Sequence, residues 1–266
     1  MLLTKSCHAT DNISRRKTLK LATLEHYRKT EIEQIADTNE GRLFFDINIE
    51  SPITVHKKWF NTLFQRQIGF GDAGCEPVHF PGVFVAKVNN QFKYSSKSAS
   101  HATIEHGHIS IQRQAVSSLV FCMSESTEAG DCREIFPDYD DDWSIKRENI
   151  KGFIAEIVDC IYERLLDQNE ELVIPKDIDP KEIQIHVDDM AVFYADRNIS
   201  ITEHKTIDFE SLVKHMAHTA FFKPTTFKKE REYRLNFVLV HNGRNIDPLV
   251  DTVIIKASDR LMEYVI

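Results

Sequence analysis

The residues from 230 to 239 alternate between two kinds of side chain, and this alternation constrains the fold more than any other feature of the sequence. One set is apolar: Tyr233, Leu235, Phe237 and Leu239. The other set is polar: Glu230, Glu232, Arg234 and Asn236. A period of two indicates a β-strand, because successive side chains of a strand point to opposite faces. The strand therefore buries one face in a core, and its polar row either faces water or lines a polar cleft.

The rest of the pattern predicts an α+β fold. Two main helices are expected, at about residues 146–167 and 208–221, because their apolar residues recur every three or four positions. Strands are expected at 108–112, 118–123, 182–187 and 190–195, a hairpin at 82–94, a short helix at 30–36, and a strand at 253–256 that pairs with the 230–239 strand. The strands at 182–187 and 190–195 are either two strands or one strand broken at 188–189. Strands and helices do not alternate regularly, which favours a mixed or mainly antiparallel sheet.

The domain organisation expected from the sequence is simple. With 266 residues and 42% hydrophobic content, the chain is long enough to bury a sizeable core. Residues 1–15 are predicted to form a loosely docked N-terminal arm, and residues 16–266 a single domain. The 9 glycines form neither of the familiar glycine-rich nucleotide-binding patterns.

The net charge and the cysteine content indicate which partners and which cellular compartment to expect. The net charge of −8 disfavours non-specific binding to a nucleic-acid backbone, although a local basic patch is compatible with it. The 5 cysteines are spread along the chain without a C-x-x-C pair, so they suggest neither a disulfide framework nor a zinc ribbon. The polar N-terminus does not read as a secretory signal, and no segment approaches membrane-spanning length. We expect a soluble cytoplasmic protein.

Residues 223–237 resemble the closing motif of a broad family of bacterial and phage proteins. In that family Lys-Pro and an aromatic residue precede Glu-x-Glu-Tyr-Arg, as Lys223, Pro224 and Phe227 precede residues 230–234 here. Residues 119–124 also resemble that family's hydrophobic strand ending in Cys/Phe-x-Ser. The resemblance covers about half of the chain loosely and names no activity.

A second resemblance implies a chemistry. An early arginine, Ser-x-Ser at the end of a central strand and Glu-x-Glu on a late strand are similar to the order of motifs in ADP-ribosyltransferases of the Arg-Ser-Glu type. The matching residues are Arg28, Ser124 with Ser126, and Glu230 with Glu232. The middle motif departs from that family, because it is Ser-Glu-Ser rather than Ser-Thr-Ser.

That resemblance implies a role for each residue. Glu232 would be the catalytic carboxylate, held by Ser124, and Glu230 would position the acceptor nucleophile. Arg28 would clamp the pyrophosphate of NAD, and we place Ser126 and Arg234 with it as cofactor-binding residues. The implied function is NAD-dependent ADP-ribosyl transfer to a protein or nucleic-acid acceptor, as in a toxin or a defence effector.

An ordinary structural interpretation competes with each of these roles. A Glu-x-Glu-x-Arg row is often a solvated strand face with a weak ion pair. Ser124 can satisfy backbone groups at a strand end, and Arg28 can be a surface or domain-tying arginine. Under this interpretation the chain is a non-catalytic phage or bacterial interaction protein that acts through an acidic surface.

Metal chemistry has weaker support. His101, His106 and His108 form a cluster, and the last two share a face of an extended segment, a spacing that suits a metal ion. The acidic run at 138–142 lacks the glycine and terminal glutamate of a calcium loop. A metal-dependent nuclease would need the histidine pair to meet carboxylates in space, so no metal site is assigned.

Overall fold

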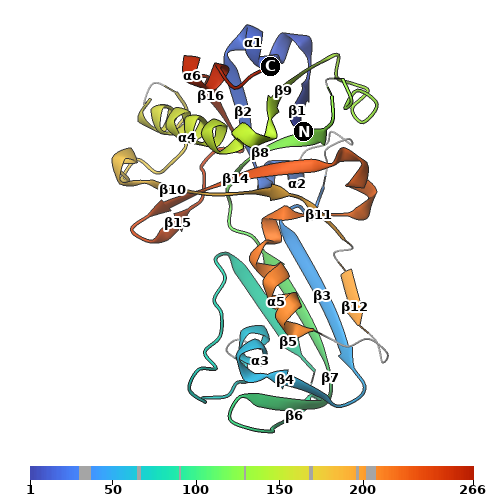
Figure 1. Cartoon of the computed structure of the whole chain (residues 1–266). Helices are drawn as coiled ribbons and strands as arrows, with labels where there is room; N and C mark the ends of the chain where they lie inside the picture. Colours follow the sequence, from blue (N-terminus) through green and yellow to red (C-terminus); the bar gives the residue numbers. More distant parts are fainter. Residues whose placement is uncertain are drawn as a thin grey trace. The chain divides into compact units, whose positions relative to one another are not determined.

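The computed structural model describes residues 1–29, 37–64, 67–89, 91–128, 130–167, 170–195, 198–201 and 208–266. The predicted α+β class is confirmed, since the sheets are mainly antiparallel and a few helices pack on them (Figure 1). Contacts within the chain form two compact units: unit 1 comprises residues 1–40, 116–194 and 223–266, and unit 2 comprises residues 41–115 and 195–222. The helix expected at 30–36 lies outside the described residues.

Unit 1 is built on an antiparallel sheet with strand order β10-β14-β8-β1-β9. Strand β15 adds to β14, and β2 joins β8 to β16. The strands are β1 (Leu2–Cys7), β2 (Thr18–Thr23), β8 (Leu119–Ser126), β9 (Asp141–Lys146), β10 (Gln184–Ala191), β14 (Glu232–His241), β15 (Arg244–Ile246) and β16 (Thr252–Lys256). Strand β10 runs through residues 188–189 without a break.

The long helix α4 (Ile150–Leu166) covers one face of this sheet (Figure 1). Its apolar stripe packs with the inward residues of the strands, including Phe121, Trp143 and Phe237, in one core cluster. The predicted apolar face of β14 is confirmed, since all four of its residues are buried in this cluster. The shorter helices of unit 1 are α1 (Ile13–Arg16), α2 (Leu24–Lys29) and α6 (Asp259–Met262).

Two expectations for unit 1 are wrong. Residues 2–7 are not a loose arm but a strand, β1, that lies between β8 and β9. Their alternation is too short to stand out, yet Leu3 is fully buried. The turn after β14 leads into β15, and β16 pairs with β2 instead of with β14. A turn sequence predicts that the chain reverses, but it does not identify the residues that pair afterwards.

Unit 2 contains a second sheet, with β12 (Asn198–Ile201), β3 (Arg42–Ile49), β7 (His101–Gln114) and β4 (Ile53–His56) in that order. Strand β12 runs parallel to β3, and the other pairings among the described strands of this sheet are antiparallel. The helices α3 (Lys57–Leu63) and α5 (Phe209–Ala217) pack in the core of this sheet. Helix α5 corresponds to the helix expected at about residues 208–221, and its apolar stripe is buried as predicted. Asp208 caps α5 by accepting hydrogen bonds from two backbone amides.

The hairpin expected at 82–94 does not form. Strands β5 (Val83–Val88) and β6 (Lys93–Ser96) instead pair in succession with the long strand β7. A β-bulge falls at Glu105, because Ile104 and His106 of β7 face consecutive residues of β6. The sequence predicted the two strands correctly, but it did not predict that both would pair with a third strand, β7, instead of with each other.

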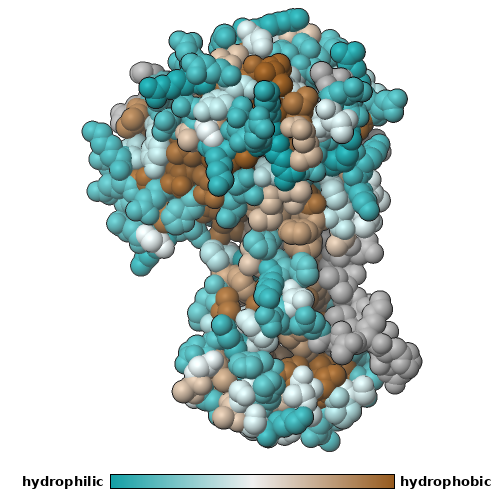
Figure 2. Space-filling view, viewed as in Figure 1, coloured by the Kyte–Doolittle hydropathy of each residue, from teal (hydrophilic) through white to brown (hydrophobic). Residues whose placement is uncertain are grey.

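None of the helices among the described residues is long and apolar enough to cross a membrane. On the face shown in Figure 2, hydrophilic residues cover most of each unit, with smaller apolar patches between them.

Candidate active site in unit 1

The polar row of strand β14 is buried. Glu232, Arg234 and Asn236 are 5%, 1% and 4% exposed, respectively, so the solvated strand face considered as an alternative is not what forms. Removing charged groups from water costs several kcal/mol each unless they are paired. The row must therefore contain its own partners, and each of its members has one.

Glu230 joins this row from outside the strand. It ends the 3₁₀ helix η5 (Thr225–Glu230), and Arg231 then adopts a left-handed backbone conformation with φ of 48°. The prediction that Glu230 and Glu232 share one strand is therefore wrong, although their carboxylates still meet. The ammonium of Lys223 donates to Glu230 Oε2 at 2.5 Å and to Glu232 Oε2 at 2.8 Å.

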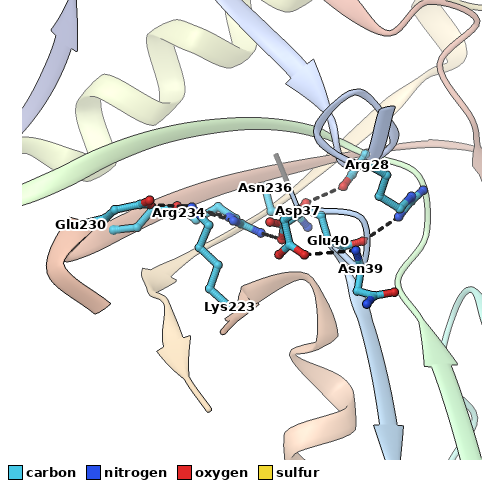
Figure 3. A network of polar contacts seen from close by, with 10 residues as sticks. Arg28, Asp37, Asn39, Glu40, Lys223, Glu230, Arg234 and Asn236 are labelled. Carbon is cyan, nitrogen blue, oxygen red and sulfur yellow. Dashed lines mark hydrogen bonds and ion pairs between the residues drawn. The ribbon is translucent and has the colours of Figure 1, made fainter. Parts of the chain in front are cut away.

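Arg234 continues the network on the other side of Glu232. Its Nε lies 2.7 Å from Glu232 Oε1, and its Nη1 lies 2.7 Å from Glu40 Oε1. Figure 3 shows this chain of contacts running from Glu230 through Lys223 and Arg234 to Glu40. Two cations thus bridge three carboxylates, two of which are neighbours in the sequence, whereas Glu40 comes from a distant segment.

The two carboxylates of the Glu-x-Glu pair differ in acidity. Burial alone would raise the pKa of Glu232, but Arg234 and Lys223 together hold it well below the ordinary range. Burial raises the pKa of Glu230, and Lys223 lowers it only in part, because the negative charges of Glu232 and Glu40 also raise it. Glu232 is therefore a firmly ionised carboxylate, whereas Glu230 holds its proton more tightly. Opposite shifts in neighbouring carboxyl groups are typical of acid–base pairs in enzymes.

Ser124 lies directly beside Glu232, because strands β8 and β14 pair these two residues in register. Both side chains are on the sheet face away from α4, and Ser124 is 4% exposed. Tyr194 adds a further constraint, since its hydroxyl accepts the backbone N–H of Glu232 at 2.7 Å. Strand pairing and the Tyr194 hydroxyl thus hold the backbone of Glu232, and Lys223 and Arg234 hold its carboxylate.

The network borders a cavity of about 80 Å³. Its charged and hydroxyl-bearing wall includes Lys5, Glu40, Ser124, Lys223, Glu230, Glu232 and Arg234, and its ring-bearing wall includes Tyr27, Phe136 and Tyr139. Cys122 also lines it, and burial raises the pKa of that thiol to about 12, so the sulfur is no thiolate nucleophile at neutral pH. The cavity combines ionised oxygen atoms with aromatic surface, as ligand sites commonly do.

Two of the predicted site residues lie elsewhere. Ser126 is not among the residues that line the cavity. Its hydroxyl lies 2.6 Å from that of Thr4, a residue of the cavity wall, and the Thr4 hydroxyl in turn lies 2.7 Å from that of Ser144. Arg28 is also absent from the cavity wall, and its Nη1 donates to the backbone carbonyl of Glu40 at 2.7 Å (Figure 3). Arg28 thereby holds the backbone of Glu40, whose carboxylate binds Arg234, so its contact is a structural one.

Sequence reasoning missed four residues of the site. Lys223 had a signal, because it stands in the Lys-Pro of the closing motif. Glu40 had none, being 194 positions from its partner Arg234. Tyr27 lies in a segment without a clear pattern. Tyr194 lies in the strand expected at 190–195, but nothing in the sequence indicated its contact with Glu232, which is 38 positions away.

The candidate metal ligands do not come together. Within the described part of the chain, no group of three or more His, Cys, Asp and Glu side chains is arranged to hold a metal ion. His108 Nε2 lies 2.6 Å from Asp46, whereas His101 packs against His56. In the acidic run, Asp140 and Asp141 instead bind the backbone amide of Ala9 and the side chain of Asn12.

Comparison with protein-family models, with curated proteins and with solved structures finds no match to this chain.

Proposed function

We propose that the cavity of unit 1 is an active site that transfers the ADP-ribosyl group of NAD to a nucleophilic acceptor. The observation that carries the proposal is the pair Glu230 and Glu232, two buried carboxyl groups with opposite pKa shifts that share the Lys223 ammonium beside one cavity. Buried groups with perturbed acidity gather at functional sites more often than elsewhere. A toxin or defence effector is the kind of enzyme we expect.

The proposed reaction needs two different carboxyl groups. The bond between C1′ of the ribose and the nicotinamide nitrogen breaks, its electron pair stays on nitrogen, and nicotinamide leaves as a neutral molecule. The ribose carbon then carries positive charge, which a fixed and ionised Glu232 is suited to stabilise. The acceptor forms the new bond to C1′ and gives its proton to Glu230, whose raised pKa makes it the stronger base of the two carboxylates.

The size of the cavity limits how NAD can bind. A volume of about 80 Å³ accepts one ring or a few water molecules, whereas pockets that bury larger ligands measure several hundred Å³. The proposal therefore places only the reacting end of NAD in the cavity. Phe136 and Tyr139, which are partly exposed in its wall, are the side chains that we expect to shift on binding.

The test is release of nicotinamide from NAD, with water and with mixed protein and nucleic-acid acceptors. Glu232→Gln keeps the side chain's size but loses its charge, and we expect at least a hundredfold loss of rate. Glu263→Gln, an exposed residue of unit 1, is the matched control and should retain the rate. Equal turnover by the wild type and Glu232→Gln would overturn the proposal, as would a wild-type protein that binds no NAD.

A non-catalytic interaction protein is the second candidate. The observation that favours it is the complete pairing of the network, in which each carboxylate already has a cation. The exposed acidic residues Glu134, Asp138 and Asp140 would then meet a basic partner, and the buried network would only support the sheet. Under this alternative, Glu232→Gln lowers stability, and the wild type neither binds nor cleaves NAD.

The proposed setting is the cytoplasm. All five cysteines are free thiols, and three of them are buried. Unpaired thiols are usual in a reducing compartment.

A further inference from the structure

A group of nitrogen donors and hydroxyls lies on unit 2, where β4 and β6 pair with the first residues of β7 (Figure 1). His56 and His101 are direct neighbours in the sheet register, and their ring centroids are 5.2 Å apart. Lys97 reaches the same place from the loop between β6 and β7, and its Nζ donates to Thr54 Oγ1 at 3.0 Å. These three residues and Thr54 are referred to below as the His–Lys cluster.

Local hydrogen bonds orient the two imidazoles. Nδ1 of His56 accepts the backbone N–H of Lys58, so the proton of the neutral ring is on Nε2. Nδ1 of His101 lies 2.8 Å from the Ser100 hydroxyl, which can donate to it and leave a second N–H on Nε2. Even as neutral rings, the two histidines can thus present two N–H donors beside the Lys97 ammonium.

The cluster has donors but no acid partner. Among the described residues, no carboxylate forms an ion pair with His56, His101 or Lys97, in contrast to His108, which binds Asp46. The side chains of Lys97, His101 and Thr54 are exposed, so a ligand can approach them. Unit 2 has 11 lysines and arginines against 9 aspartates and glutamates, whereas unit 1 has 22 against 32. An anion therefore meets a weaker repulsive field at unit 2.

We propose that the His–Lys cluster binds a phosphate group. Phosphate oxygens accept several hydrogen bonds at once, and charged donors strengthen those bonds. The phosphate belongs either to a free polyphosphate or nucleotide, or to a nucleic-acid backbone. The site is independent of the proposed chemistry of the unit 1 cavity, since all of its residues belong to unit 2.

The experiment titrates the full chain, labelled with ¹⁵N, with sodium pyrophosphate, with ATP and with a single-stranded oligonucleotide, and follows the imidazole signals. We expect saturable shifts of the Nε2 resonances of His56 and His101. Lys97→Gln should weaken binding about tenfold, because one charged hydrogen bond is lost. The double variant His56→Gln/His101→Gln should abolish it. His106→Gln, which removes another imidazole of β7, is the control and should bind as the wild type does.

The outcomes separate the sources and can overturn the proposal. Tight binding of the oligonucleotide alone assigns the cluster to a nucleic-acid backbone, and binding of all three assigns it to phosphate in general. Absence of any shift at His56 and His101, or equal binding by the double variant, contradicts the inference. Far-ultraviolet circular dichroism checks that each variant is folded. If the double variant does not fold, the comparison of Lys97→Gln with the wild type decides the test, because equal binding by these two proteins also contradicts the inference.

Discussion

The guanidinium of Arg234 lies 2.7 Å from the carboxylate of Glu232, two residues away along strand β14. Both side chains are almost fully buried, and Arg234 also binds Glu40. Burial alone would lower the pKa of Arg234, but these two carboxylates hold it well above its ordinary value. The pair is thus the centre of the charge network in unit 1, and its removal has measurable consequences.

Replacement of Arg234 by Met keeps most of the side-chain volume and removes the charge. Glu40 then remains buried without this cation, and Glu232 keeps only Lys223. We expect the free energy of unfolding to fall by about 3 kcal/mol, the usual cost of breaking a buried ion pair. Urea unfolding measures it. Arg244→Met, at an exposed site of β15, is the control and should change stability by less than about 0.5 kcal/mol; equal losses would refute the structural role of the network.

The variants Glu230→Gln and Glu232→Gln should respond to pH in opposite ways. The pKa of Glu232 is lower in the folded protein than its value of about 4.3 in an unfolded chain, so its carboxylate contributes stability that is present above about pH 5 and lost on acidification. The pKa of Glu230 is raised on folding, so its contribution is largest at low pH and falls as the pH rises.

Glu232→Gln should therefore cost most at pH 7 and least below about pH 4, whereas Glu230→Gln should cost less at pH 7 than at pH 4. Urea unfolding at pH 4, 5.5 and 7 checks both variants. Parallel pH profiles for the two would contradict the difference in acidity that the proposed reaction needs.

Ser126→Ala tests whether that serine is structural. Its hydroxyl lies against Thr4 inside the sheet, so its loss should lower the free energy of unfolding by about 1 kcal/mol and leave NAD binding unchanged. Thermal unfolding and calorimetric titration measure the two effects. A variant of unchanged stability that no longer binds NAD would instead restore the cofactor-binding role implied by the Ser-x-Ser resemblance.

The buried ion pair of Lys57 should contribute to the stability of unit 2. Lys57 is 1% exposed, and its ammonium lies 2.6 Å from Asp72 and 4.6 Å from the centre of the Phe70 ring. Lys57→Met should lower the stability of unit 2 by about 2 kcal/mol and speed amide exchange in residues 67–75. Lys58→Met, at the next and partly exposed position, is the control. Equal exchange in the two variants would show that Lys57 does not hold this loop.

Much of the fold follows from local pattern, and much of the site does not. The alternation of β14 and the stripe of α4 are local, so their apolar residues identify the core directly. The pairing of β1 with β8 and β9, and of β16 with β2, depends on contacts between distant residues that no single segment encodes. The same holds for Glu40, whose partner Arg234 lies on another element. Glu230 meets Glu232 although it is not on the strand, because Arg231 turns the backbone through a left-handed conformation.

The most direct test of the proposed active site is NAD binding to the wild type and to Ser124→Leu, measured by calorimetry on the folded full chain. Leucine at position 124 fills the cavity beside Glu232 and leaves all charged residues in place. If the cavity holds the reacting end of NAD, the wild type binds and Ser124→Leu binds at least about tenfold more weakly, a difference of about 1.4 kcal/mol. Equal affinity of the two proteins, or no binding by the wild type, would contradict the account.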